Sequence, residues 1–108
     1  MIAERYCHLP EKFICAGISL ENIGIDEVAW GKEAALAVVD YLGEKGYTIL
    51  GGDVYKYDDG KIIITYDSWY FEATHKKNSV TLSGLKAKEY IEEYNKVNGE
   101  EYIYSIIF

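Results

Sequence analysis

The stretch Ile49–Glu72, ILGGDVYKYDDGKIIITYDSWYFE, decides the fold because it holds two β-prone runs on either side of a short turn. Residues 47–57 and 61–71 are rich in Ile, Tyr, Val and Thr, a composition typical of strands. Between them, Asp58-Asp59-Gly60 favours a three-residue loop, in which a type I turn is followed by a glycine in the left-handed region. The stretch therefore predicts a β-hairpin.

The loop length fixes the register of this hairpin, because a slip of one residue sends every side chain to the opposite face. A three-residue loop pairs Val54 with Ile64, Asp53 with Thr65, Gly51 with Asp67 and Ile49 with Trp69. In that register one face is suited to packing under helices and carries Val54, Ile62, Ile64 and Tyr66. The opposite face carries Ile49, Asp53, Tyr55, Ile63, Thr65, Asp67, Trp69 and Phe71.

The second of these faces has an unusual composition. A solvated sheet face normally carries scattered polar side chains, but this one places two aspartates among aromatic rings. Rings flanked by hydrogen-bonding groups are common at the centres of protein–protein interfaces. We therefore expect this face to bind another protein. The alternative is that Tyr55 and Trp69 complete a core that the N-terminal segment covers.

Gly51 and Gly52 stand in the first strand of the hairpin, where glycine weakens pairing. Their presence predicts either a β-bulge or a close approach by an aromatic ring or a second backbone. Both reasons remain open at the level of the sequence.

Helical periodicity appears on both sides of the hairpin. Residues 32–45 carry Leu36, Val39 and Leu42 at helical spacing, and Gly46 follows as a stop. A second helix is predicted over residues 84–98, with an apolar stripe of Ala87, Tyr90, Ile91, Tyr94 and Val97. A shorter helical stretch begins at Pro10 and ends at Gly17.

The C-terminal run YIYSIIF, residues 102–108, is short, apolar and β-prone. Because it follows a strand and a helix, we expect it to return to the same sheet through a crossover. The predicted fold class is α+β: a small sheet built on the hairpin (residues 47–57 and 61–71) and this C-terminal strand, with the helices over residues 32–45 and 84–98 on one face.

The charge of the chain restricts its partners. Its 108 residues include 11 Lys and Arg against 18 Asp and Glu, so the formal net charge is −7. Such a surface repels nucleic acid, because direct binding depends on lysine and arginine at the phosphates. It favours a basic protein partner, since complementary charge speeds encounter.

Hydrophobic residues make up 49% of the chain, yet no apolar run approaches the roughly 20 residues that cross a bilayer. The first residues, MIAERYCHLP, lack the basic start and the apolar stretch of a secretory signal. We therefore expect a cytoplasmic protein with no membrane partner, folded as a single domain over residues 1–108.

Few residues suggest a metal site or a catalytic site. Cys7, His8 and Cys15 lie close in sequence but lack the further soft ligands of a zinc site, and His75 stands alone in a polar segment. We expect no metal and no cofactor. Asp53 and Asp67 share a face in the register above, so they are a candidate acid/base pair in which repulsion raises the proton affinity of one carboxylate.

Motifs in and around the hairpin resemble a known family. They are IGIDEVAWGKEAAL at residues 23–36, ILGGDVY at 49–55, TYDSWYFE at 65–72 and AKEYIEEY at 87–94. Together they resemble the immunity protein 40 family of bacterial polymorphic-toxin immunity proteins over Ser19–Tyr94. Neither the segment around His75 nor the tail after Asn98 shows a pattern of that family.

The resemblance implies a small α+β protein, made beside a cognate toxin gene, that binds the toxin's C-terminal domain and neutralises it without enzymatic activity or cofactor. Many such toxins are basic nucleases, and acidic side chains can cover their phosphate-binding groove. On this hypothesis the toxin-binding residues are Asp53, Tyr55, Asp58, Asp59, Asp67, Trp69 and Glu72.

Three alternatives remain beside this hypothesis. In the first, the motif residues hold the fold and more variable loops contact the toxin, because specificity among toxins calls for divergent contacts. In the second, the chain is a small hydrolase that uses the Asp53 and Asp67 pair. In the third, the chain is a structural module that forms a homodimer, since its oligomeric state is open.

Overall fold

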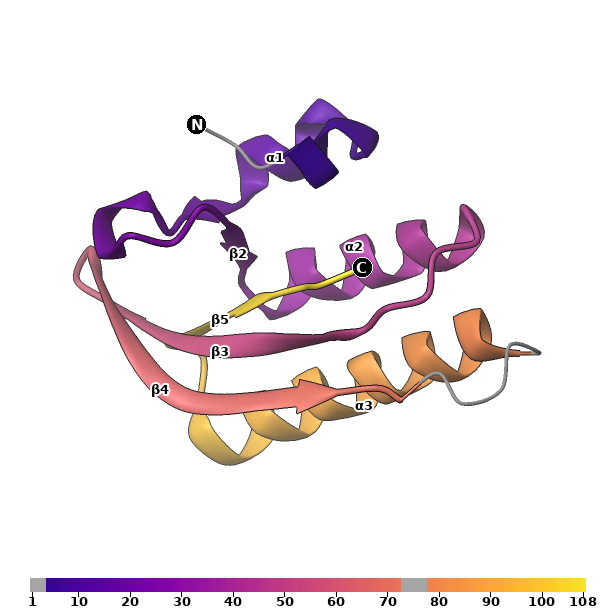
Figure 1. Cartoon of the computed structure of the whole chain (residues 1–108). Coiled ribbons are helices and arrows are strands. Elements are labelled where there is room, and N and C mark those ends of the chain that lie inside the picture. Colours follow the sequence, from indigo (N-terminus) through magenta and orange to yellow (C-terminus); the bar gives the residue numbers. More distant parts are fainter. Residues whose placement is uncertain (1–3, 73–77) are drawn as a thin grey trace.

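The computed structural model describes residues 4–72 and 78–108. His75, which was expected in a polar segment, lies outside these residues. Along the chain its elements, drawn in Figure 1, are η1 (Glu4–His8), α1 (Glu11–Ala16), β1 (Ile18–Ser19), η2 (Glu21–Ile23), β2 (Val28–Trp30), α2 (Lys32–Glu44), β3 (Gly51–Asp58), β4 (Lys61–Tyr70), α3 (Ser79–Asn98) and β5 (Tyr102–Ser105). The predicted α+β class is confirmed.

The strands form one five-stranded antiparallel sheet in the order β1-β2-β5-β3-β4. The C-terminal strand β5 lies between β2 and β3, so each of the crossovers β2–α2–β3 and β4–α3–β5 passes over one strand. The hairpin is therefore at one end of the sheet, and β4 has a strand neighbour on one side only within the described sheet.

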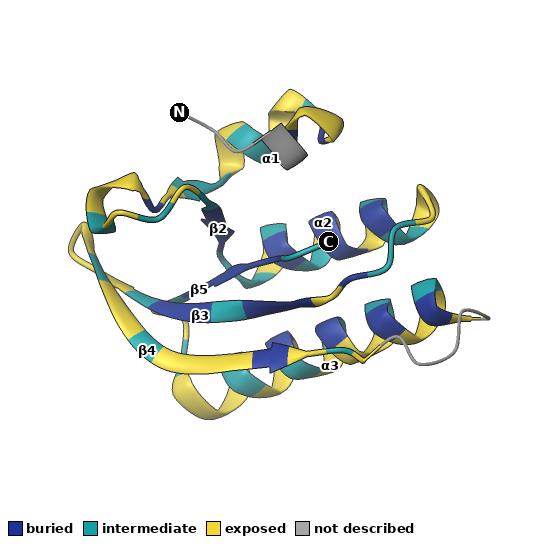
Figure 2. Cartoon of the chain, viewed as in Figure 1, coloured by how far each residue is buried: buried dark blue, intermediate teal, exposed yellow. Residues whose placement is uncertain are grey.

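The helices cover one face of the sheet. α2 and α3 pack against each other, and the core beneath them includes Trp30, Val54 and Tyr104 from three strands. On the opposite face, Tyr55 and Ile103 pack in a smaller cluster with residues of the N-terminal segment. Figure 2 shows the inner strands β3 and β5 mostly buried and β4 mostly exposed.

Both main helices follow their predicted apolar stripes. α2 buries Ala35, Val38, Val39 and Leu42, and it ends one residue before the predicted bound of residue 45. α3 begins at Ser79 rather than near residue 84, and its buried residues follow four-residue spacing as Ser79, Ser83, Ala87, Ile91 and Asn95. Small side chains at the start of this stripe let α3 lie close to the chain before β3, where Ser83 Oγ accepts a hydrogen bond from the Ile49 N–H at 2.9 Å.

The hairpin turn has two residues rather than the predicted three. Asp58 pairs with Lys61, and only Asp59 and Gly60 lie between them. Both have positive φ, 50° and 78°, as a type I′ turn requires. Asp tolerates the left-handed region better than most residues, so the shorter turn forms. This change alone shifts the pairing near the turn by one residue, and Ile64 faces Tyr55 instead of Val54.

A large bulge then changes the register a second time. Tyr55 pairs with Ile64 and Asp53 pairs with Ser68, so one residue of β3 stands against three of β4. The Thr65 side chain closes this bulge: its Oγ1 donates to the Val54 carbonyl at 2.7 Å and accepts from the Asp67 N–H at 3.1 Å.

The predicted faces of β4 are wrong because the shorter turn shifts the register by one residue, which exchanges the two faces of a strand. The bulge adds a shift of two residues and leaves the faces exchanged. Trp69 lies under the helices with Ile49, whereas both were expected on the opposite face. Ile62 packs on the Tyr55 side, whereas it was expected under the helices. Tyr66, also expected under the helices, is 90% exposed.

Candidate protein-interaction surface

The residues predicted to bind a toxin do not share one environment. Asp58, Asp59, Asp67 and Glu72 are exposed, Asp53 is partly exposed, and Tyr55 and Trp69 are buried. The predicted outward display of Tyr55 and Trp69 beside the acids is therefore wrong. Each of the two rings packs into a different side of the sheet.

Trp69 lies on the helix-covered face and stacks on Tyr90 of α3, with ring centroids 4.9 Å apart. Its partner across the ladder is Gly52. A Cβ atom on Gly52 would collide with the Trp69 ring and with the carbonyl oxygen of Ser105. The predicted close approach of a ring and a second backbone to glycine is thus confirmed, and Trp69 stabilises the fold.

Tyr55 lies on the other face and is buried with Leu20 and Ile103. Its pKa is raised to about 12, first by burial and then by the negative charges of Asp53 and Glu27. Because Leu20 belongs to the N-terminal segment, the alternative of a core covered by that segment is correct for this ring.

Asp53 and Asp67 point to opposite faces of the sheet. Asp53 lies opposite Ser68, and its backbone N–H donates to Ser105 Oγ at 3.1 Å. Side chains alternate along a strand, so Asp67 turns to the other face, where its Oδ2 accepts a hydrogen bond from the Tyr94 hydroxyl at 2.8 Å. The expected acid/base pair on one face is therefore wrong.

An exposed surface of rings and carboxylates is present, but the β4 bulge and α3 form it. Tyr66 is 90% exposed at the bulge, and the exposed Asp67 follows it. Tyr94 joins α3 to Asp67 through the hydrogen bond described above. We call this region the bulge surface and define it as Tyr66, Asp67, Tyr90, Glu93, Tyr94 and Val97.

A small hollow of about 200 Å³ lies in the α3 part of the bulge surface. Its lining residues are Tyr90, Glu93, Tyr94, Val97 and Asn98. The rings of Tyr90 and Tyr94 stack with centroids 5.9 Å apart, and Val97 is 70% exposed. The hollow therefore combines aromatic and aliphatic walls with one carboxylate side chain.

The hydroxyl groups of Tyr90 and Tyr94 stay protonated at neutral pH. The pKa of Tyr94 is raised to about 12, chiefly by burial and next by its hydrogen bond to Asp67. Burial and the Asp67 charge also raise the pKa of Tyr90. The negative charge of this surface thus comes from Asp67 and Glu93.

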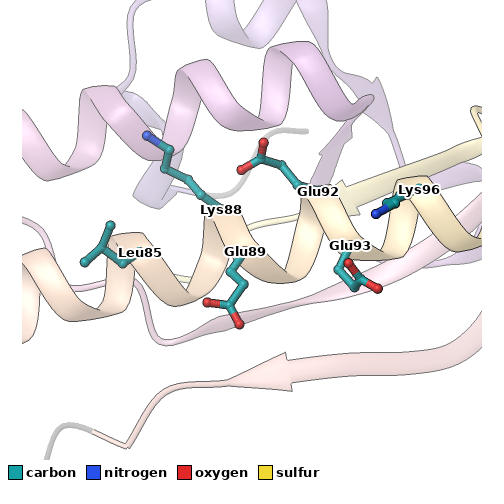
Figure 3. A pocket seen from close by; sticks show the side chains of 6 residues that line it. All are labelled: Leu85, Lys88, Glu89, Glu92, Glu93 and Lys96. Atoms are coloured by element: carbon teal, nitrogen blue, oxygen red, sulfur yellow. The ribbon is translucent and has the colours of Figure 1, made fainter.

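A larger hollow of about 530 Å³ runs along α3 (Figure 3) and is lined by Leu85, Lys88, Glu89, Glu92, Glu93 and Lys96. Figure 3 shows Lys88 pointing toward α2, while Glu89 and Glu93 point toward the side of β4. Lys88 Nζ lies 2.9 Å from Asp40 Oδ1, which raises the pKa of Lys88. These side chains form a solvated helix face with ordinary surface ion pairing.

The family model of immunity protein 40 matches residues 19–108, most of the chain. The chain belongs to this family. The match includes the tail after Asn98, so the expectation that the tail shows no family pattern is wrong. Comparisons with curated proteins and with solved structures gave no match. Membership in an immunity protein family suggests toxin neutralisation by protein binding, which is in general not an enzymatic function.

Three further findings concern this member of the immunity protein 40 family. No helix in residues 4–72 and 78–108 has the length and apolar character needed to cross a membrane. Over the same part of the chain, no three His, Cys, Asp or Glu side chains gather in a way that could hold a metal ion. Cys7 and Cys15 are free and exposed.

Sequence reasoning missed the exposure of Tyr66 and the part that α3 takes in the surface of this family member. Tyr90 and Tyr94 were identified only as members of an apolar helix stripe, although their hydroxyl groups allow partial exposure. The chain carried no simple signal for Tyr66, because its outward position depends on the bulge beside it.

Proposed function

We propose that this chain binds the C-terminal domain of a cognate bacterial toxin and neutralises it as a protein inhibitor. The observation that carries the proposal is the bulge of β4 in a member of an immunity protein family. The bulge leaves the Tyr66 ring 90% exposed, and it is followed by the exposed Asp67, whose carboxylate accepts a hydrogen bond from Tyr94. Tyrosine with a polar neighbour is typical of interface hot spots.

The proposed partner surface is basic. The net charge of −7 favours such a partner, and exposed carboxylates can pair with arginine and lysine that would otherwise contact phosphate. A nuclease domain has this kind of surface. We propose that Asp58, Asp59, Asp67 and Glu72 contact the toxin, that Asp53 lies at the margin, and that Tyr55 and Trp69 act through the fold.

The test is to co-express the chain with the toxin domain encoded beside its gene and to measure growth, complex mass and Kd. We expect rescue of growth and a complex of defined stoichiometry. Asp58→Asn with Asp59→Asn should weaken binding roughly fivefold, because two exposed charge pairs contribute about 1 kcal/mol together. Asparagine tolerates the positive φ of residue 59, so the turn is kept.

The matched control is Glu33→Gln with Glu44→Gln, which removes two exposed charges from α2. It should lower the affinity for the toxin domain far less, because the same net charge is lost away from the hairpin. Absence of both rescue and complex would refute the proposal. A mass that rises with concentration in the absence of toxin would support a homodimerising module instead.

A further inference from the structure

The hollow between Tyr90, Tyr94 and Val97 has the size of a side-chain site. Its volume of about 200 Å³ is below the roughly 300–1,000 Å³ of pockets that bury drug-sized ligands. Its lining residues come from neighbouring turns of the C-terminal half of α3, so the walls are held on one rigid element. The hollow therefore suits a single side chain of a partner protein.

Carboxylate oxygens are the main hydrogen-bonding groups that the hollow offers to a partner, because donors beside it bond within the chain. The Tyr94 hydroxyl already donates to Asp67, and Asn98 Nδ2 donates to the Tyr94 carbonyl at 3.1 Å. Glu93 adds a second carboxylate, which Figure 3 shows on the side of α3 toward β4. Within residues 4–72 and 78–108, neither Asp67 nor Glu93 takes part in an ion pair. These features favour a cation over an anion.

The aromatic walls favour a guanidinium group among cations. Tyr90 and Tyr94 both line the hollow, and a planar, weakly hydrated guanidinium packs on aromatic rings and forms paired hydrogen bonds with carboxylates. The chain already uses a related contact nearby, because Lys86 Nζ lies 5.6 Å from the centroid of the Tyr70 ring. A lysine ammonium from a partner fits the walls less well, since it makes neither planar contact.

We infer that this hollow receives an arginine side chain of the toxin domain, with its guanidinium between the Asp67 and Glu93 carboxylates and its methylene groups against Val97. The inference rests on the proposed function and deepens it by naming the group recognised. The partner is protein, since the net charge of −7 and the two carboxylates complement a basic surface and repel nucleic acid.

A titration without toxin tests the hollow directly. The probes are N-acetyl-L-arginine amide and its neutral isostere N-acetyl-L-citrulline amide, and the readout is the NMR shift of the Val97 methyl groups and the Tyr94 ring. We expect saturable shifts with the arginine probe that are several times larger than those with citrulline. Asp67→Asn with Glu93→Gln should abolish the difference. Equal shifts with both probes, or a difference that persists in this variant, would overturn the inference.

Toxin binding supplies the second readout. Asp67→Asn keeps an oxygen that can accept from the Tyr94 hydroxyl, so the fold is kept while the charge is lost. Each of Asp67→Asn and Glu93→Gln should raise the Kd for the toxin domain at least tenfold, because the arginine loses one of its charged partners in the complex. The matched controls Glu33→Gln and Glu44→Gln should leave the Kd within about twofold.

The two proposals fail in different ways. If the wild-type chain does not bind the toxin domain, the proposed function is wrong, and the arginine titration still decides whether the hollow binds a guanidinium. If wild type binds the toxin domain but Asp67→Asn and Glu93→Gln bind it with unchanged Kd, the proposed function stands and the arginine site is wrong.

Discussion

Two aromatic residues three positions apart on β4 have opposite environments, since Trp69 is 5% exposed and Tyr66 is 90% exposed. Trp69 belongs to a regular part of the ladder, opposite Gly52, and stacks under α3. Tyr66 lies in the bulge with a φ of 67°, a conformation that costs a non-glycine residue about 1–3 kcal/mol.

The difference separates a ring that stabilises the fold from a ring that does not. An exposed side chain on a strained backbone contributes little to folding, so contact with a partner is the better physical reason for an aromatic residue at position 66. The bulge is what divides β4 into these two regions, and each prediction below changes one of them.

The largest effect is expected at the buried end of the strand. Trp69→Ala should lower the free energy of unfolding by about 3–5 kcal/mol, because it removes a large buried ring and leaves a cavity under α3. Urea unfolding followed by circular dichroism measures this loss. Trp69→Phe keeps the stack on Tyr90 and should cost clearly less. Similar costs for both substitutions would show that the stack does not hold α3.

The second effect concerns the partner of Trp69 across the ladder. Gly52→Ala should lower the free energy of unfolding by roughly 2–3 kcal/mol, because a Cβ atom there collides with the Trp69 ring and the Ser105 carbonyl. Gly43→Ala is the matched control, since it lies within α2 with open space at its Cβ. It should stabilise the helix by about 1 kcal/mol. A tolerated Gly52→Ala would contradict the close approach.

At the bulge, substitutions of Tyr66 should affect toxin binding and the free energy of unfolding independently of each other. Tyr66→Ala and Tyr66→Gly both remove the ring and should weaken toxin binding at least tenfold, as the loss of an interface anchor does. Tyr66→Gly should nevertheless unfold with a free energy about 1 kcal/mol higher than Tyr66→Ala, because glycine adopts the positive φ without strain.

Tyr70 provides the control for this pair, because it is an exposed ring on the same strand and does not have a positive φ. Tyr70→Gly should be less stable than Tyr70→Ala by roughly 0.5–1 kcal/mol, the ordinary sign for glycine within a strand. Urea unfolding compares the Gly variant with the Ala variant at each position. If the Ala variant is the more stable one at both Tyr66 and Tyr70, the bulge does not strain residue 66.

The elements of the fold were largely predictable from the sequence, because their signals are local. Periodicity at Leu36, Val39 and Leu42 identified α2, and the β-prone runs identified the hairpin and β5. The turn was not predictable in length, since Asp58-Asp59-Gly60 is compatible with two-residue and three-residue loops. The choice depends on the φ that Asp59 adopts.

The candidate site was predictable only in part, because it depends on the bulge. Asp67 was identified as a site residue, but its neighbours were wrong, since Thr65 uses its hydroxyl to hold two extra residues out of the ladder. The alternation of polar and apolar residues along β4 gives no sign of this bulge. The two-residue turn shifts the register by one residue and so exchanged the expected faces of Tyr66 and Trp69, while Tyr94 reaches Asp67 only through the packing of α3.

The smallest predicted effect concerns Tyr94, which connects the two regions by stacking on Tyr90 and donating to Asp67. Its pKa is raised to about 12, chiefly by burial. The folded protein therefore holds a proton that the unfolded chain releases near its ordinary pKa of about 10. The stability from this group is complete below pH 10 and falls as the pH rises toward 12.

Tyr94→Phe should therefore make the alkaline loss of stability less steep, because one of the groups that release a proton on unfolding is absent. Tyr55 also has a pKa raised to about 12 and keeps its share of the pH dependence. Urea midpoints between pH 8 and pH 12 measure the slope. Asp67→Asn should show a slope between those of wild type and Tyr94→Phe, because the Tyr94 hydroxyl then faces a neutral amide. Identical slopes for wild type and Tyr94→Phe would show that neither burial nor the hydrogen bond to Asp67 raises the pKa of Tyr94 in the folded protein.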